Sequence, residues 1–223
     1  MPPRFYLHKT LNSQCLKNCN KTDREELAVN EMCSLVSSNY DSLSIRCVGD
    51  WAEEKIYIIS QYLGIFATGM HSKWGKVNYI EICCGPGRCI DRKSRCEFDG
   101  TSLSILKHES FKYINKALFF DYDSQVVSCL NQRIKNLQVS NAFVNHGDYN
   151  ESSSICDVIR KEINPKSLTL VVIDPTDCSV PFSLIQDLSY LLPNMDLIIN
   201  VASGTDFNRN ALNVLSDPGK YKN

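Results

Sequence analysis

The segment VNYIEICCGPGR, residues Val77–Arg88, decides the fold of this chain. Its first seven residues are mainly β-branched, aromatic or apolar, which predicts a buried strand, and Gly85-Pro86-Gly87 predicts a tight turn after it. In an open α/β sheet, the turn after the first strand is where a nucleotide-like ligand lies. The two glycines let the backbone approach such a ligand closely, because they lack a Cβ. Glu81, near the end of the strand, can accept a hydrogen bond from a ligand amine or a ribose hydroxyl.

Four further apolar runs follow this turn, and segments with helical spacing separate them. The predicted strands are Lys116–Asp121, Asn141–Asp148, Leu168–Asp174 and Asp196–Val201. The predicted helices are Trp51–Met70 with Asp50 as its N-cap, Gly100–Tyr113, Ser124–Leu137, Ser153–Ile163, Phe182–Leu192 and one opening in Phe207–Leu215. Strands that alternate with helices predict an α/β fold with a Rossmann-like, doubly wound, mainly parallel sheet that is buried on both faces.

Length and composition set the broad class. The chain has 223 residues, 43% hydrophobic content and a formal net charge of -1, which is ordinary for a globular protein with a sizeable core. A protein that binds nucleic acid tightly and without sequence specificity is strongly basic, and this chain is not. The N-terminus lacks the apolar core of a signal peptide, and no apolar run reaches the ~20 residues that span a bilayer. We therefore expect a cytoplasmic protein without a membrane segment.

Residues 1–50 are polar and irregular, and we expect them to form an N-terminal extension before an α/β domain at residues 51–223. The extension contains Cys15, Cys19, Cys33 and Cys47, four of the 11 cysteines in the chain. A zinc or iron–sulfur site needs thiolates that converge in space. The spacing of Cys15 and Cys19 suits a metal-binding turn only loosely, and there is no second close pair. We therefore expect free thiols and no metal ion.

A charged segment, Cys89–Asp99, separates the glycine turn from the next predicted helix. Its polarity predicts an exposed loop at the mouth of a ligand site. Arg88, Arg92, Lys93 and Arg95 form a basic cluster in or beside this loop. We expect this cluster to be a solvated surface. The alternative is a contact with the phosphates of a nucleic-acid substrate.

Acidic residues end four successive predicted strands. They are Glu81, Asp121, Asp148 and Asp174. Because the carboxyl ends of parallel strands meet at one edge of the sheet, these four side chains should gather where α/β proteins bind their ligands. A single acid in such a place often caps the next helix instead. Acids at the ends of four successive strands, with a Gly-Pro-Gly turn after the first strand, favour a binding site.

This arrangement resembles the class I S-adenosylmethionine-dependent methyltransferases. The resemblance implies that the first motif holds the methionine moiety of S-adenosylmethionine, that Asp121 binds the ribose hydroxyls and that Asp148 lies beside the adenine amine. Asp174-Pro175 would lie next to the sulfonium and the incoming substrate. The implied cofactor-binding residues are Glu81, Cys83, Gly85, Pro86, Gly87, Asp121, Asp148 and Asp174. Cys83 stands where the common motif has its first glycine.

Several motifs resemble a narrower family, the three-Cys-motif partner proteins. They are YIEICCGPGR at 79–88, GTSL at 100–103, FFDYD at 119–123 and IDPTD at 173–177, with the helix upstream of the first and the NRN at 208–210. The resemblance covers residues 51–215. It implies a methyltransferase-like protein that occurs beside a cysteine-motif protein, which would be its partner. Five strands are visible where a methyltransferase sheet has seven, so we expect a fold without its last strands or a chain that belongs to a longer protein.

Methyl transfer from a sulfonium is an in-line displacement, so the protein must hold donor and nucleophile in line and remove a proton if the nucleophile carries one. We expect Asp174 to orient or deprotonate the nucleophile, with Asp177 as the second catalytic candidate. Enzymes that methylate exocyclic base amines have an aromatic residue at the end of this motif. Thr176-Asp177 fill the last two places here, which disfavours a flipped base as the acceptor.

Two functions stay open. The first is an active S-adenosylmethionine-dependent methyltransferase whose substrate the sequence does not reveal. The alternative is a catalytically inactive, methyltransferase-like module that binds a protein partner or a nucleic acid, which the unusual Cys83-Cys84 pair and the short C-terminal part favour. A nicotinamide dinucleotide enzyme is disfavoured, because the three-glycine fingerprint of those enzymes is missing.

Overall fold

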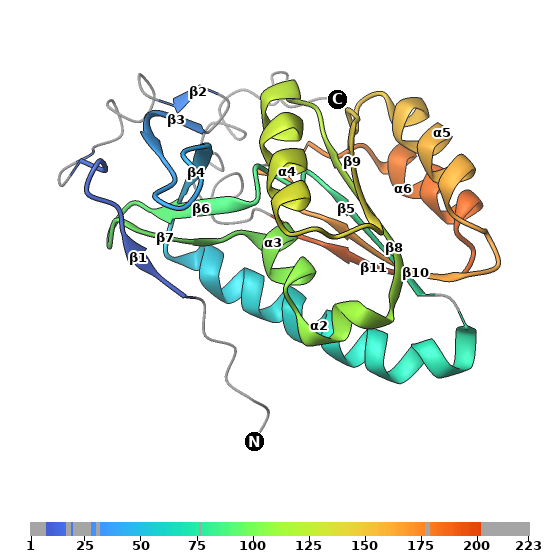
Figure 1. Ribbon diagram of the computed structural model, residues 1–223. Coiled ribbons are helices and arrows are strands. Elements are labelled where there is room, and N and C mark those ends of the chain that lie inside the picture. Colours follow the sequence, from blue (N-terminus) through green and yellow to red (C-terminus); the bar gives the residue numbers. More distant parts are fainter. Residues whose placement is uncertain are drawn as a thin grey trace.

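A parallel five-stranded sheet forms the centre of the computed structural model, which describes residues 8–16, 19, 28–29, 32–75, 77–176 and 179–201 (Figure 1). Its strands are β5 (Val77–Ile82), β8 (Ile114–Asp121), β9 (Ala142–His146), β10 (Leu168–Ile173) and β11 (Met195–Ile199). Their order is β11-β10-β5-β8-β9, and all four pairings are parallel. The predicted α/β fold with a mainly parallel sheet is confirmed. The strands after β5 are added first on its β8 side and then on its β10 side, so the strand order reverses between β5 and β10.

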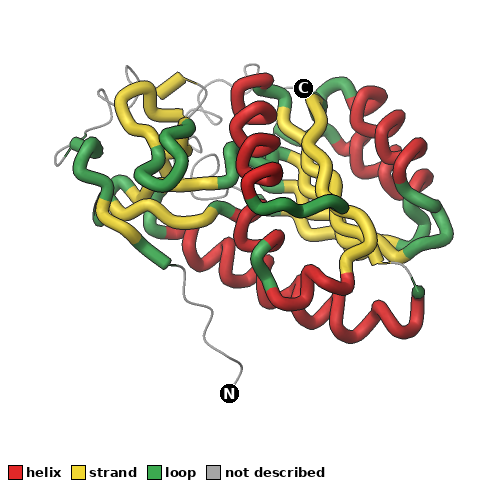
Figure 2. The backbone as a smooth tube through the Cα atoms, in the orientation of Figure 1, coloured by secondary structure: helices red, strands yellow, loops and turns green. Residues whose placement is uncertain are grey.

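Helices cover both faces of this sheet (Figure 2). The elements on one face are α2 (Trp51–Trp74), α3 (Thr101–Leu106), the 3-10 helix η1 (Glu109–Tyr113) and α4 (Ser124–Asn136); those on the other are α5 (Ser152–Glu162) and α6 (Phe182–Leu191). The alternation of side chains along β5 sets this division. Tyr79 packs in the cluster with α2, α3 and α4, whereas Ile80 and Ile82 pack with α5 and α6.

Helix α2 is the longest helix in the described part of the chain, and it packs against β5 and β10. Glu53 and Glu54 in its first turn and His71 and Lys73 in its last turn complement the helix dipole. Gly75 ends it with a positive φ of 68°. The Asp50 cap predicted from the sequence is wrong, because the side chain of Asp50 makes no capping hydrogen bond and its backbone is already helical.

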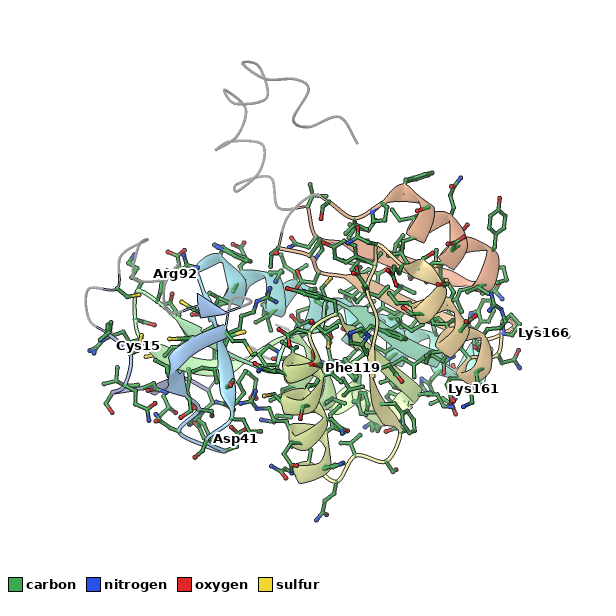
Figure 3. The ribbon with its side chains drawn as sticks, turned by 90° about the horizontal axis from the view of Figure 1, so that it is seen from above. Cys15, Asp41, Arg92, Phe119, Lys161 and Lys166 are labelled. Atoms are coloured by element: carbon green, nitrogen blue, oxygen red, sulfur yellow. The ribbon has the colours of Figure 1, made fainter. Side chains whose placement is uncertain are left out.

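A second, six-stranded sheet lies beside the first and joins two distant parts of the sequence. Its strands are β1 (Thr10–Leu11), β2 (Ala28–Val29), β3 (Met32–Ser37), β4 (Ser44–Val48), β6 (Arg88–Asp91) and β7 (Cys96–Asp99), in the order β1-β7-β6-β4-β3-β2. Figure 3 shows it from above at one end of the molecule, with Asp41 and Arg92, while Phe119 lies in the parallel sheet. The boundary at residue 50 stays a prediction, and the structure adds that segments on either side of it share this sheet.

The expected exposed loop at Cys89–Asp99 is wrong, because this segment forms the β6–β7 hairpin of the second sheet. Its charges can be buried because they satisfy one another. Arg88 donates to Glu97 at 3.3 Å and to Asp99 at 2.8 Å, and Glu97 also accepts from the Asn12 and Ser38 side chains. Arg88 is therefore a buried structural residue instead of part of a solvated cluster.

The predicted helix at Phe207–Leu215 and the motif at 208–210 lie outside the described residues. None of the helices in the described ranges has the length and apolar character that a bilayer-spanning segment needs.

Candidate functional site

The loop Cys83–Gly87, here called the glycine loop, leaves β5 at the point where the sheet order reverses. Its backbone has positive φ angles at Cys83 (66°), Gly85 (64°) and Gly87 (91°). Gly87 needs to be glycine, because a Cβ there would lie 2.9 Å from Leu130 Cδ1. Cys83 takes the left-handed conformation where the common motif has glycine, which is a strained backbone for a residue with a Cβ. The sharp turn therefore forms in spite of the missing first glycine.

Asp121 ends β8 and holds the glycine loop. Its Oδ2 accepts a hydrogen bond of 3.0 Å from the Gly85 N–H, and its Oδ1 accepts one of 3.1 Å from the Asp123 N–H. Burial raises the pKa of this carboxyl above its ordinary value, and the two backbone N–H groups work against that increase. Asp121 thus lies at the glycine loop, where it lines a cavity at the carboxyl end of the sheet.

Asp174, at the end of β10, is paired with a lysine that the sequence reading did not assign to the site. Lys55 Nζ, from α2, lies 2.8 and 2.6 Å from the two carboxylate oxygens of Asp174. Asn200 Nδ2 donates to Oδ1 at 2.9 Å. Lys55 also lies 5.1 Å from the ring centroid of Trp51. The pair brings one positive and one negative charge to the carboxyl end of the sheet.

Glu81 lies deeper than the sequence predicted. It is completely buried on the face of β5 that packs against α2 and α3, and the Tyr79 hydroxyl donates to its Oε2 at 3.0 Å. Burial raises the pKa of Glu81 to about 8, and the negative charge of Asp174 adds to the increase. At neutral pH the side chain is therefore mostly protonated. Glu81 accepts the hydrogen bond from the Tyr79 hydroxyl beneath the glycine loop.

The raised pKa of Glu81 gives a test by pH. Because this pKa lies near 8 in the folded chain against an ordinary value of 4.5, the unfolded chain releases the proton first. The stability that the protonated group contributes is complete below pH 4.5 and is lost as the pH rises to about 8. We expect the free energy of unfolding of the wild type, relative to Glu81→Gln, to fall by about 1.4 kcal/mol per pH unit in this window. Denaturant titrations between these limits measure it, and parallel pH profiles would contradict it.

Two adjoining cavities open at this edge of the sheet. The larger has a volume of about 280 Å³ and the smaller of about 100 Å³. They share a wall made of Arg46, Cys83, Gly85, Pro86, Pro175 and Thr176. The larger extends towards Trp51, Lys55, Thr101 and Asp174, whereas the smaller extends towards Asp121, Tyr122, Val126 and Tyr149. An elongated molecule can therefore lie across the glycine loop with one part in each cavity.

The structure brings most of the predicted site residues together. Those that line the cavities are Cys83, Gly85, Pro86, Gly87, Asp121 and Asp174. Glu81 lines neither cavity. Asp148 also lines neither, and its Oδ1 accepts from the backbone N–H and the side-chain amide of Asn150 at 2.8 and 3.0 Å. Asp177 lies outside the described residues.

Three cationic side chains at the larger cavity were not predicted as site residues. They are Arg46 on β4, Lys55 on α2 and Arg92 after β6. Lys55 had a signal in the sequence, because it stands among the apolar residues that recur along one face of the first predicted helix. Arg92 had one as a member of the basic cluster in the sequence, whereas Arg46 had none, because its place at the cavity depends on the pairing of β4 with β6.

The glycine loop is also tied to the second sheet. The buried Arg133, on α4, donates to the Pro86 carbonyl at 2.6 Å and to the Ser44 carbonyl at 3.0 Å. Its Nε and one terminal nitrogen bind the two carboxylate oxygens of Asp41 at 2.7 and 2.9 Å. Burial alone would raise the pKa of Asp41, but the hydrogen bonds from Arg133 and the Leu43 N–H, together with the charges of Arg133 and Arg88, outweigh it and lower this pKa. One guanidinium therefore connects α4, the glycine loop and the turn before β4.

The N-terminal cysteines lie closer together than their spacing suggests. Cys15, Cys33 and Cys47 pack in one small cluster with Ile45 and Ile90. Burial raises the pKa of the Cys15 thiol to about 11, and Cys47, Cys19 and Cys33 add to the increase. Across the described ranges, no group of three or more His, Cys, Asp or Glu side chains has the arrangement that holds a metal ion. The expectation of free thiols without a metal stays a prediction.

Comparison with known proteins gives matches of structure. No family model and no curated protein sequence matches the chain. An rRNA methylase from Streptococcus thermophilus aligns with a TM-score of 0.41 and 11% identity over 72% of this chain and 77% of its own. An S-adenosylmethionine-dependent methyltransferase from Clostridium acetobutylicum gives 0.39 and 8% over 65% and 50%. SMU.1697c from Streptococcus mutans, solved in complex with S-adenosylhomocysteine, gives 0.38 and 12% over 70% and 81%. At these identities the likeness concerns the fold alone.

Proposed function

We propose that this protein is an S-adenosylmethionine-dependent methyltransferase. The observation that carries the proposal is the position of Asp121, which binds the glycine loop at the reversal point of the sheet and faces one of two adjoining cavities. A carboxylate at this place suits ribose hydroxyls, and an open turn with glycines suits a ligand that approaches the backbone. The residues that we propose to bind the methyl donor are Cys83, Gly85, Pro86, Gly87, Asp121, Asp174 and, from the resemblance, Glu81 and Asp148.

The shape and chemistry of the cavities fit this cofactor. The smaller cavity offers Asp121 to a ribose and the rings of Tyr122 and Tyr149 to an adenine. The larger cavity offers Thr101, Arg46 and the Lys55–Asp174 pair to a charged amino-acid tail. When bound, S-adenosylmethionine supplies an electrophilic methyl group on its sulfonium. The residues of the chain hold the donor across the glycine loop and exclude water from the two cavities there.

Asp174 and Asp177 are the residues that we propose for the acceptor. Asp174 is fixed by Lys55 and Asn200, so its carboxylate can orient an acceptor hydroxyl or amine without moving. Because Lys55 faces both of its oxygens and Asn200 binds one of them, this side chain suits orientation better than proton removal. Asp177 follows Thr176 of the shared cavity wall and is the second candidate for taking a proton.

Calorimetric titration of the purified chain with S-adenosylmethionine tests the proposal. We expect binding, no binding of NAD, and a loss of affinity of roughly 10- to 100-fold in Asp121→Ala, because the variant lacks both the charged acceptor and the anchor of Gly85. Asp157→Ala is the matched control, since Asp157 is an exposed acid on α5. Unaltered affinity in Asp121→Ala, or no binding by the wild type, would contradict the proposal.

The second candidate is a methyltransferase-like module that binds a partner without catalysis. The observation in its favour is that Lys55 and Asn200 already bind the oxygens of Asp174. If this candidate holds, the protein binds S-adenosylmethionine or its product but releases no S-adenosylhomocysteine with any cell fraction. Release of that product from one fraction, and none from the same fraction with Asp174→Asn, would favour the enzyme.

We also propose the narrower assignment to the three-Cys-motif partner proteins. The motifs at 79–88, 100–103, 119–123 and 173–177 support it. This assignment carries with it a cytoplasmic location and a cysteine-motif protein as the partner. Co-expression with such a protein and co-purification at a fixed ratio would support the partnership, and separate elution of the two would count against it.

A further inference from the structure

We infer that Arg46, from the second sheet, binds the carboxylate of the donor's methionine moiety, so that the N-terminal segment completes the donor site. The inference rests on the proposed function and adds a residue that the resemblance does not supply, since Arg46 precedes the part of the chain that the resemblance covers. Arg46 lies between the two cavities, where it can meet the charged part of the donor.

Arg46 lies at the junction of the two cavities and lines both of them. It also lies over the glycine loop, because a Cβ added to Gly85 would come within 3.4 Å of its Nη1. Its positive charge lowers the pKa of Asp121, against the stronger effect of burial. The guanidinium therefore lies over the glycine loop, which by the resemblance holds the methionine moiety of the donor.

The other two cations of the larger cavity have different surroundings. Lys55 faces the carboxylate of Asp174 at 2.6 Å, so its charge is matched within the chain. Arg92 lines the larger cavity alone, and its Nε donates to the Val48 carbonyl at 3.0 Å. Arg46 is the cation that reaches from the larger cavity to the glycine loop, which makes it the better placed of the three for a ligand anion.

The charges of the donor identify the group that Arg46 would bind. S-adenosylmethionine has two positive groups, the sulfonium and the amine, and one negative group, the α-carboxylate. A guanidinium binds a carboxylate through paired, charge-assisted hydrogen bonds and repels the other two groups. The α-carboxylate is therefore the group of the amino-acid tail that Arg46 attracts.

The second sheet holds Arg46 in place on both sides. In the strand register, Arg46 pairs with Met32 of β3 and with Cys89 of β6. Arg133 ties the turn before β4 to the carbonyl of Pro86, next to the glycine that Arg46 covers. A side chain on a paired strand interior is better positioned than one on a loop, which suits a contact that selects a ligand group.

A ligand pair that differs in the amino-acid tail, which contains the only carboxylate, tests the inference. Wild type and Arg46→Met are titrated with S-adenosylhomocysteine and with 5′-methylthioadenosine, which lacks the amino-acid tail. We expect Arg46→Met to lose roughly 10- to 100-fold in affinity for S-adenosylhomocysteine and less than about 2-fold for 5′-methylthioadenosine. Arg46→Lys keeps the positive charge. It should therefore keep more than half of the preference for S-adenosylhomocysteine over 5′-methylthioadenosine that Arg46→Met loses. Arg92→Met is titrated as well, because Arg92 is the competing cation of the larger cavity. Lys93→Met, at an exposed lysine that follows Arg92, is the matched control and should change neither affinity by more than about 3-fold.

The outcomes separate this inference from the proposed function. Binding of S-adenosylhomocysteine by the wild type with equal losses on both ligands in Arg46→Met, or with none, would overturn the role of Arg46 and leave the donor site standing. A loss in Arg92→Met that depends on the carboxylate would move the role to Arg92 and overturn the assignment. Failure of the wild type to bind either ligand would overturn the proposed function and this inference together.

Discussion

Replacement of Arg133 by methionine is expected to lower the free energy of unfolding by about 4 kcal/mol. Arg133 is 3% exposed, and its guanidinium binds both oxygens of Asp41 as well as the carbonyls of Ser44 and Pro86. Methionine fills a similar length but leaves the Asp41 carboxylate and two carbonyls without their donor. Removing one partner of a buried pair is costly, because the remaining charge loses its compensation.

Denaturant unfolding of Arg133→Met measures this effect, and Lys135→Met on the same helix is the control. Lys135 is exposed, so its replacement should change stability by less than about 0.5 kcal/mol. The double variant Asp41→Asn with Arg133→Met should be more stable than the sum of the single losses, because the unpaired charge is gone. A loss below about 1 kcal/mol in Arg133→Met would mean that Arg133 does not hold the glycine loop to the second sheet.

Replacement of Lys55 by methionine is expected to cost about 3 kcal/mol of stability and to weaken donor binding as well. The side chains of Lys55 and Asp174 are 21% and 7% exposed, so both are largely removed from water. Without the lysine, Asp174 keeps the amide of Asn200 as its partner and lies near the buried Glu81. Two carboxyl groups would then share one poorly hydrated region with no cation between them.

The pair allows a rescue that a purely steric effect would not show. Lys55→Met combined with Asp174→Asn should recover more than half of the lost stability, because the unpaired carboxylate is replaced by a neutral amide. Lys73→Met, at the exposed end of the same helix, is the matched control and should be close to neutral. If the double variant is no more stable than Lys55→Met, the charge of Asp174 is not the reason for the loss.

Much of the parallel sheet could be predicted from the sequence, because its central strands β5 and β10 are buried on both faces and read as nearly continuous apolar runs. β10 is buried along its whole length, and its predicted and observed bounds differ by one residue. The glycine loop and Asp121 were predicted for the same reason. A turn of unusual composition follows one such run, and an acid ends the next.

The second sheet could not be predicted, because its strands pair across long stretches of sequence and hide their charges in mutual contacts. Arg88 and Glu97 look like surface residues when each is taken alone, yet they neutralise each other inside the sheet. The position of Glu81 was missed for a related reason. Strand alternation places it on the same face as Tyr79, which turns its carboxyl into the core instead of towards the loop.

The pairing of β4 with β6 and of β1 with β7 has a consequence for the order of folding. The N-terminal strands are made first, but β4 gains its second neighbour, β6, and β1 its neighbour, β7, only after α2 and β5 have been synthesised. Pairings between distant residues form slowly, and strands without partners are prone to associate edge to edge with other chains. The newly made N-terminal segment therefore depends on the parallel sheet to bring its missing neighbours back, and a nascent chain that stalls before Cys96 is left with open strand edges.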